Sequence, residues 1–255
     1  MARIHRAAAE GFARSADAYE RGRPGYPAAA VSHLVDRLPA RATVLDLAAG
    51  TGKLTRPLLA AGLSVISVEP VAEMRAALPR ETRALPGTAE AIPLADGAVD
   101  AVAVGQAFHW FDGDAALAEI HRVLRPDGLL ALFWNRRVED APINRAIGEL
   151  LAPYGGAVPT HRGDAWRAAF ERTDLFGPLD ERAFEHSQEL DAAGMEARVG
   201  SVSFIASLDP DERSGVLARA RALAGDGEVS VPYRTDVQVC RAAMQGGERS
   251  VRTPS

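Results

Sequence analysis

The chain has 255 residues, of which 47% are hydrophobic and 25% charged, a balance typical of a soluble globular protein large enough for one domain with a small cap. Its net charge of −5 disfavours a nucleic-acid partner, which needs a basic face, and no apolar run approaches the roughly 18 residues that span a bilayer. The single cysteine, Cys240, excludes an intramolecular disulfide and a multi-cysteine metal site, so we expect a protein of the reducing cytoplasm.

Short apolar runs alternate with helical patterns from about residue 43 to residue 134. Strands are predicted at 43–48, 63–70, 82–87, 98–105 and 128–135, because these runs are short and mostly continuous, as in a parallel sheet covered on both faces. A helix is predicted at 114–124, capped by Asp112 or Asp114 and ended by a turn at 125–128. The alternation predicts an α/β fold with an open, doubly wound, mostly parallel sheet.

After Trp134 the alternation stops. Residues 138–182 are predicted to be helical and loop-rich, and two late strands are predicted at 182–190 and 228–242, with a helix at 210–224 between them. Since no internal repeat or linker interrupts the chain, we expect a single domain over residues 1–245. Within it, residues 1–30 form an N-terminal segment and residues 138–182 a cap insertion, while residues 246–255 form a disordered tail.

A glycine-rich turn, "LDLAAGTGKLT" at residues 45–55, follows the first predicted strand. It is not a P-loop, because Leu54 follows Lys53 where that motif needs Ser or Thr. It matches the dinucleotide fingerprint only in part, because Thr55 replaces the third small residue. Glu69 lies 19 residues after Gly50 and can accept ribose hydroxyls in the dinucleotide interpretation as well as in the one that follows.

An S-adenosylmethionine loop fits the stretch better. Such a loop needs an acid after the first strand, a turn of small residues and an acid after the second strand, and Asp46, residues 48–52 and Glu69 fill these places. Small residues let the backbone approach the ligand, and the following helix offers its amides. An acid at Asp46 suits a ligand that carries an ammonium and a sulfonium, whereas it would repel a pyrophosphate.

Six motifs in order carry a resemblance to a known family. They are "YERGRPGYP" (19–27), "VLDLAAGTGKLT" (44–55), "VEP" (68–70), "GTAEAIPLADGAVD" (87–100), "GQAFHWFD" (105–112) and "RVLRPDGLL" (122–130). Over about residues 10–136 the chain resembles the class I S-adenosylmethionine-dependent methyltransferases, and within them the small-molecule branch of type 11 and trans-aconitate methyltransferase-like proteins. The resemblance implies a seven-stranded Rossmann-like methyltransferase fold and S-adenosyl-L-methionine as the cofactor.

The resemblance also implies roles for single residues. Residues 88–90 match the segment that flanks the adenine, and Gln106 matches a position beside the methionine portion. Tyr19 and Arg23 match the N-terminal segment that closes over the cofactor, where Arg23 can pair with its carboxylate. Ala48 replaces a glycine of many relatives, and we expect no loss of binding. The predicted cofactor-binding residues are Tyr19, Arg23, Asp46, Ala48, Gly50, Gly52, Glu69, Pro70, Met74, Thr88, Ala89, Glu90 and Gln106.

His109 follows the fourth predicted strand, at the edge where open α/β sheets bind ligands. It is the candidate catalytic residue, as a general base, and the alternatives are a wall of the acceptor pocket or a histidine hydrogen-bonded to backbone. An acceptor carboxylic acid is already ionised and needs no base. Arg136 either holds an anionic acceptor or lies on the surface, and Trp166 either contacts the acceptor or packs in the core. The predicted acceptor-binding residues are Tyr26, Trp110, Asn135, Arg136 and Trp166. The histidines lack metal-ligand spacing, so no metal site is expected.

We therefore predict methyl transfer to a carboxylate or hydroxyl oxygen of a small metabolite, by in-line displacement, with catalysis arising mostly from positioning and the exclusion of water. No membrane or nucleic-acid partner is expected. A macromolecule methyltransferase on the same fold and a cofactor-binding regulator or cyclase without methyl transfer remain alternatives, and dinucleotide-dependent reduction is a more distant one. The acceptor and the oligomeric state stay open.

Overall fold

A seven-stranded mixed sheet forms the centre of the computed structural model, which describes residues 20–155 and 164–243. The strand order is β3-β2-β1-β4-β5-β7-β6, and β7 runs antiparallel to both of its neighbours. The remaining pairs are parallel, so the predicted doubly wound, mostly parallel sheet is confirmed. The strands are β1 (Thr43–Leu47), β2 (Ser64–Val68), β3 (Arg83–Leu85), β4 (Val99–Gly105), β5 (Leu124–Arg137), β6 (Asp180–Leu190) and β7 (Val229–Arg241).

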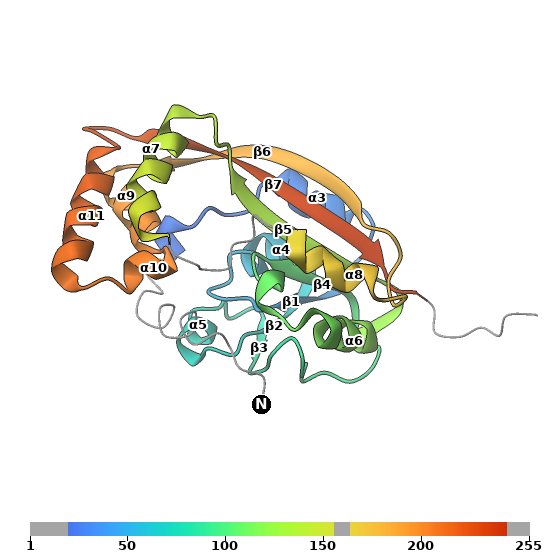
Figure 1. Cartoon of the computed structure of the whole chain (residues 1–255). Helices are drawn as coiled ribbons and strands as arrows, with labels where there is room; N and C mark the ends of the chain where they lie inside the picture. The colour runs from blue at the N-terminus through green and yellow to red at the C-terminus, as the bar shows by residue number, and fades with distance from the viewer. Residues whose placement is uncertain (1–19, 156–163, 244–255) are drawn as a thin grey trace, which may run out of the picture.

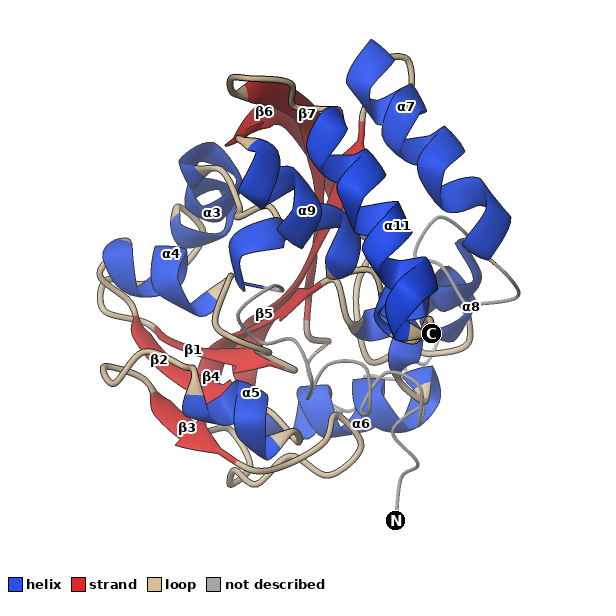
Figure 2. Ribbon diagram, turned by 90° about the vertical axis from the view of Figure 1, so that its left-hand side faces the viewer, coloured by secondary structure: helices blue, strands red, loops and turns tan. Residues whose placement is uncertain are grey.

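Helices cover both faces of this sheet (Figure 1, Figure 2). On one face α3 (Ala28–Val35) and α4 (Thr55–Ala60) pack against alternate residues of β1, β4 and β5. On the other face α6 (Gly113–Val123) and α8 (Ala168–Glu171) pack against the intervening residues. Within β5, for example, Phe133 joins the first cluster and Trp134 the second. Burial on both faces explains why the central strands are continuously apolar in sequence.

The helix predicted at 114–124 is α6, and its cap is Asp112, whose carboxylate accepts a hydrogen bond from the Ala115 amide at 3.3 Å. The turn predicted at 125–128 is instead the irregular start of β5, which begins at Leu124 directly after the helix. The pairing register with β4 shifts between Val99 and Ala101, and Asp127 takes φ 62°. A β-bulge at the start of β5 therefore replaces the predicted turn.

A helical lobe stands at the end where β5 and β6 finish and β7 begins (Figure 1). We define it as α7 (Pro142–Leu151), α9 (Ala192–Gly200), α10 (Ser203–Ala206) and α11 (Pro210–Ala222), which share a buried cluster of their own. The sequence pattern predicts α11 but not α9 or α10. The segment predicted as one cap is divided, because α7 belongs to the lobe whereas α8 packs beside α6. The assignment of these segments as a cap stays a prediction, and the predicted tail lies outside the described residues.

Candidate active site

The glycine loop, residues 48–52, joins β1 to the turn before α4 and passes repeatedly through the left-handed backbone region. The φ angles are 58° at Ala48, 57° at Gly50 and 92° at Gly52. Glycine adopts this region freely, whereas an L-residue in it costs roughly 1–2 kcal/mol, so Ala48 holds local strain. At Gly52 an added Cβ would also lie 2.9 Å from Cδ of Pro79. The loop therefore depends on its two glycines.

Glu69 lies directly after β2 with 4% of its surface exposed. Its Oε2 accepts the Gly50 amide at 2.8 Å and its Oε1 accepts the Val71 amide at 2.9 Å. Burial raises the pKa of Glu69 above its ordinary value, and the two amides oppose that rise. Because each carboxylate oxygen has a second lone pair, the anchored group can still accept two ligand hydroxyls. This is the arrangement expected for recognition of a ribose.

Asp46 lies beneath the loop, with 1% of its surface exposed. The Thr55 hydroxyl donates to its Oδ2 at 2.6 Å and lies 3.2 Å from the Ser67 hydroxyl, which in turn lies 2.9 Å from that of Thr82. Burial raises the pKa of Asp46 to about 7, and the negative charge of Glu69 adds to the rise. This placement favours a role in joining β1 to α4 and β2 over the predicted contact with the cofactor ammonium.

Residues 20–26, which we call the strap, cross the glycine loop. The carboxylate of Glu20 accepts the Thr51 hydroxyl at 2.6 Å, and it pairs with Lys53 at 3.4 Å and with Arg56 at 3.1 Å. The Lys53 ammonium also donates to the backbone carbonyl of Glu20. Tyr19, which the sequence assigns to the same segment, lies outside the described residues. The strap is therefore anchored to the start of α4 by hydrogen bonds and ion pairs.

On its other side the strap contacts the helical lobe. A Cβ added to Gly22 would lie 2.2 Å from the carbonyl oxygen of Ala197 in α9, so only glycine permits this approach. The Nη2 of Arg23 donates to the carbonyl of Ser201 at 2.9 Å. The strap thus lies between the glycine loop and α9. The expected pairing of Arg23 with a cofactor carboxylate stays a prediction.

The segment after β3 is tied to α6. Thr88 forms a bridge with Ala91, Ala89 is 4% exposed, and Oε1 of Glu90 accepts the Asp112 amide at 3.0 Å. These contacts fix residues 88–90 beside the carboxyl ends of the strands, and their role at the adenine stays a prediction. The two remaining predicted cofactor residues, Pro70 and Met74, lie next to Glu69 and in α5 (Ala72–Ala76), where Met74 is 4% exposed.

Tyr26 crosses the end of β4. A Cβ added to Gly105 would lie 2.5 Å from the Tyr26 hydroxyl, and the Tyr26 ring packs edge-on against Phe133 with 5.6 Å between ring centres. The next residue, Gln106, takes φ 57° and donates through Nε2 to the carbonyl of Asn135 at 2.9 Å. Two predicted site residues, Tyr26 and Gln106, are therefore brought to the carboxyl ends of β4 and β5.

An aromatic group follows β4 in the short helix η1 (Phe108–Trp110). The ring centre of His109 lies 4.6 Å from that of Trp110 and 5.7 Å from that of Trp134. Trp134 packs in turn on Trp166, which is 6% exposed, so core packing is favoured over acceptor contact for Trp166. Burial lowers the pKa of His109 to about 4, which leaves a neutral imidazole that is a weak base. The site therefore favours His109 as a wall of the acceptor pocket over His109 as a general base.

Two predicted acceptor residues already have protein partners. Asn135 is 6% exposed, and its amide donates to the carbonyl of Gly25 at 2.9 Å and accepts the Thr235 hydroxyl at 2.5 Å. Arg136 pairs with Asp236, with 2.9 Å between Nε and Oδ2. These contacts favour a role for Asn135 in holding the strap, whereas Arg136 shares the Asp236 carboxylate with Arg234, so contact of either residue with an acceptor stays a prediction.

Residues 45–132 match a family model described as a methyltransferase domain. An uncharacterized methyltransferase from Mycobacterium tuberculosis (strain ATCC 25618 / H37Rv) is 41% identical over 236 residues, which cover 88% of this chain and 92% of that relative. The chain belongs to the class I S-adenosylmethionine-dependent methyltransferases.

Two further similarities bear on this methyltransferase. The structure of a candidate type II methyltransferase from Anaeromyxobacter dehalogenans has a TM-score of 0.63 and 24% identity, and it covers 87% of this chain and 97% of its own, which supports the fold. A malonyl-[acyl-carrier protein] O-methyltransferase from Pectobacterium atrosepticum is 36% identical over 132 residues, which are 49% of this chain and 51% of that protein. In residues 20–155 and 164–243 no helix is long and apolar enough to cross a membrane.

Sequence reasoning missed two residues of this methyltransferase that the structure places near the site. Glu20 lies in the quoted motif at 19–27, but its partners Thr51, Lys53 and Arg56 follow only after more than 30 positions. Arg198 lies in α9, which no predicted element covers. The one sequence signal for Arg198 is a charged residue in a stretch that includes Met195 and Val199, and this signal alone does not identify a buried side chain.

Proposed function

We propose that this methyltransferase binds S-adenosylmethionine at the glycine loop, Glu69 and the strap, and that it methylates a carboxylate oxygen of a small-molecule acceptor. The cofactor fits the residues present, because the loop has glycines at positions 50 and 52, where the backbone can approach a ligand, beside a buried, doubly anchored carboxylate. When bound, this cofactor supplies an electrophilic methyl group on a sulfonium whose departure as a neutral thioether needs no acid.

The protein's own residues position the two reactants and exclude water from them. The strap is tied to the loop through Glu20 and to the lobe through Arg23, so it is placed to exclude water from the ends of β4 and β5. Tyr26 and the aromatic side chains of His109 and Trp110 lie at the same edge, and His109 packs on the buried Trp134. Holding two reactants there in line is worth several kcal/mol, on the order of 7–11 in favourable cases.

The lowered pKa of His109 is the observation that favours a carboxylate as the methyl acceptor. Taking a proton from an alcohol or phenol needs a base whose pKa lies near the working pH, and burial holds the pKa of His109 at about 4. A carboxylic acid has lost its proton at neutral pH and needs no such base. The malonyl-[acyl-carrier protein] O-methyltransferase relative supports an oxygen acceptor.

Carbon is the second candidate acceptor. A ubiquinone/menaquinone biosynthesis C-methyltransferase from Rubrivivax gelatinosus is 40% identical over 166 residues, which are 60% of this chain. The alternatives of a macromolecule methyltransferase and of a regulator or cyclase also remain, and the net charge of −5 counts against a nucleic-acid substrate. A cytoplasmic location stays a prediction.

An acceptor screen tests the proposal. The full-length protein is incubated with S-adenosylmethionine and separate sets of carboxylic acids, phenols, amines and activated carbon acids, and adenosylhomocysteine and the methylated product are measured by mass spectrometry. We expect turnover with members of the carboxylate set, and at least tenfold slower turnover with Glu69→Ala at S-adenosylmethionine concentrations below the wild-type Kd. Turnover confined to amines or carbon acids would refute carboxylate methylation. Absence of turnover with every set would favour the regulator or cyclase.

A further inference from the structure

Arg198 is a charged side chain buried in the helical lobe. It is 6% exposed, its Nε donates to the Tyr233 hydroxyl at 2.6 Å, and its guanidinium carbon lies 5.9 Å from the centre of the Tyr233 ring. Within the described ranges its Nη1 is buried with no hydrogen-bond partner, and no ion pair includes Arg198. By contrast Arg136 and Arg167 each pair with a carboxylate.

The energetics of this burial call for an anion. Removing a guanidinium from water without a carboxylate is strongly unfavourable. A hydrogen bond to the Tyr233 phenol offsets part of this cost, and the position of Arg198 in the last turn of α9 offsets a smaller part through the helix dipole. These contacts account for part of the cost, and a bound anion would offset the rest.

Arg198 also lies where an acceptor has to bind. Its partner Tyr233 is directly opposite Arg137, the last residue of β5, so the contact marks the carboxyl end of that strand. Ligands of open α/β sheets bind beyond this end. On the side toward the cofactor loop, the backbone nitrogen of Arg198 lies 2.5 Å from the position of a Cβ on Gly22, which puts the strap against it.

Positive charge gathers around this place. Arg23 of the strap donates to the carbonyl of Ser201, three residues after Arg198, and Arg137 lies on the same face of the β5–β7 pair as Tyr233. An anionic ligand bound here would lie near these guanidinium groups, which favours it over a neutral ligand. A carboxylate suits the planar fork of arginine, which can donate to both of its oxygens.

We propose that Arg198 binds a carboxylate of the methyl acceptor at the junction of the strap, α9 and the end of β5, and so selects anionic acceptors over neutral ones. This inference rests on the proposed function. The cofactor carries a carboxylate too, at its amino-acid end, and the test separates these two sources.

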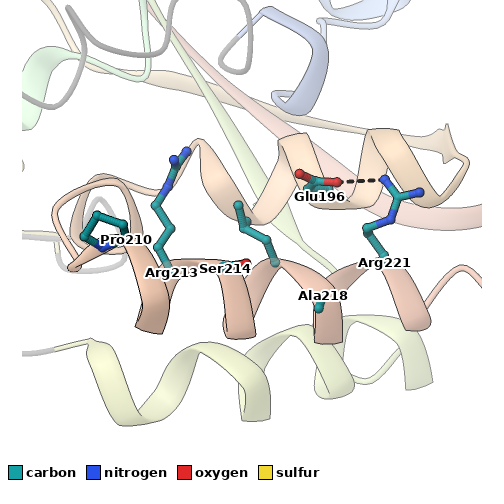
Figure 3. Close-up of a pocket in the computed structure, with 7 residues that line it drawn as sticks. Glu196, Pro210, Arg213, Ser214, Ala218 and Arg221 are labelled. Atoms are coloured by element: carbon teal, nitrogen blue, oxygen red, sulfur yellow. Dashed lines mark hydrogen bonds and ion pairs between the residues drawn. The ribbon is translucent and has the colours of Figure 1, made fainter.

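The test compares Arg198→Gln with Arg198→Lys and with the control Arg221→Gln. Arg221 lies in the same lobe on the outer groove between α9 and α11, where it pairs with Glu196 at 2.7 Å (Figure 3). Calorimetry with saturating adenosylhomocysteine measures binding of acetate, succinate, citrate and benzoate against acetamide, succinamide and benzamide. We expect wild type and Arg221→Gln to prefer at least one carboxylate to its amide, Arg198→Gln to lose that preference by tenfold or more, and Arg198→Lys to retain part of it.

Three outcomes would overturn the proposal. The wild type could bind carboxylates no better than amides, or Arg198→Gln could keep the preference while only its melting temperature falls, which is the signature of a structural role. Arg198→Gln could also weaken adenosylhomocysteine but not methylthioadenosine, which lacks the amino-acid end, and the ligand would then be the cofactor. If Arg198→Gln does not fold, the ratio of carboxylate to amide affinity is measured for Arg198→Lys instead. A ratio equal to that of the wild type would then overturn the proposal. Carboxylate binding is also measured without adenosylhomocysteine. Failure of the wild type to bind adenosylhomocysteine would therefore refute the proposed function without deciding whether Arg198 binds a carboxylate.

Discussion

At the scale of single residues, Asp46 combines deep burial with a position under the glycine loop. Its pKa of about 7 in the folded chain lies above the ordinary value of 3.8. Between these two values the folded chain binds more protons than the unfolded chain, so the free energy of unfolding falls as pH rises through this window. The stabilising contribution of the protonated carboxyl is complete below about pH 4 and is lost above pH 7.

Asp46→Asn should therefore change the pH dependence of stability. The amide cannot ionise and can still accept the Thr55 hydroxyl, so relative to wild type the variant should gain more than about 1 kcal/mol in free energy of unfolding between pH 5 and pH 8. Urea unfolding at both pH values measures this, with Asp226→Asn at an exposed turn as the control. A constant difference between Asp46→Asn and wild type would show that Asp46 ionises freely in the fold.

His109 is the second residue whose environment predicts its behaviour. Since its pKa of about 4 lies below the ordinary 6.5, the imidazole stays neutral in the folded chain at pH 6 and above. The rate of methyl transfer to a carboxylate should therefore show no inflection near pH 6.5, and His109→Phe, which keeps an aromatic ring beside Trp110, should lower kcat by less than about tenfold. A general base would be worth roughly 10²–10⁴-fold, so initial rates across pH 5.5–8.5 decide between the two roles.

At the scale of elements, the strap connects two parts of the fold that are far apart in sequence. Gly22 contacts the backbone of α9 closely, whereas a Cβ added to Gly25 would have no neighbour within 4 Å. Gly22→Ala should therefore displace the strap from the lobe, lower stability by about 1–3 kcal/mol and weaken adenosylhomocysteine at least threefold. Gly25→Ala is the matched control and should leave both quantities unchanged. Equal effects of the two changes, in melting and calorimetry, would contradict the strap's contact with α9.

The elements also show how far sequence reasoning reaches. The seven strands, helices α6 and α11 and the glycine loop are predictable because short-range patterns determine them: apolar runs, a capping aspartate and small residues in a turn. The boundary between α6 and β5 is missed, since a register shift replaces the turn. Helices α9 and α10 are missed because the apolar residues of α9 are few and are buried only by packing on α7, α11 and β7.

The site residues also fall into two groups, those determined by local sequence and those determined by the tertiary fold. Glu69, Gly50 and Gly52 are found from sequence because their spacing reflects local backbone geometry. The partners of Asn135 and Arg136 are not, because Gly25, Thr235 and Asp236 reach them only through the tertiary fold, over about 100 positions in each case. Long-range pairing of this kind leaves no pattern in a single sequence.

At the scale of the whole molecule, the fold places the described residues that we propose for cofactor binding around the carboxyl ends of β1 to β5 and lays the strap between the glycine loop and the helical lobe. Both the family membership and this arrangement of residues support cofactor binding. The proposed acceptor chemistry depends on that binding. The proposed function requires that the glycine loop, Glu69 and the strap bind one ligand together.

The most direct measurement is titration calorimetry of the full-length protein with S-adenosylmethionine, adenosylhomocysteine and NAD, on the wild type and on Glu69→Ala. We predict micromolar binding of the first two ligands, none of NAD, and at least tenfold weaker binding to Glu69→Ala, because two hydrogen bonds from the ribose to a carboxylate are lost. Thermal unfolding of the variant checks that it is folded. Binding of NAD alone, or of adenosylhomocysteine with equal affinity to both proteins, would contradict the account.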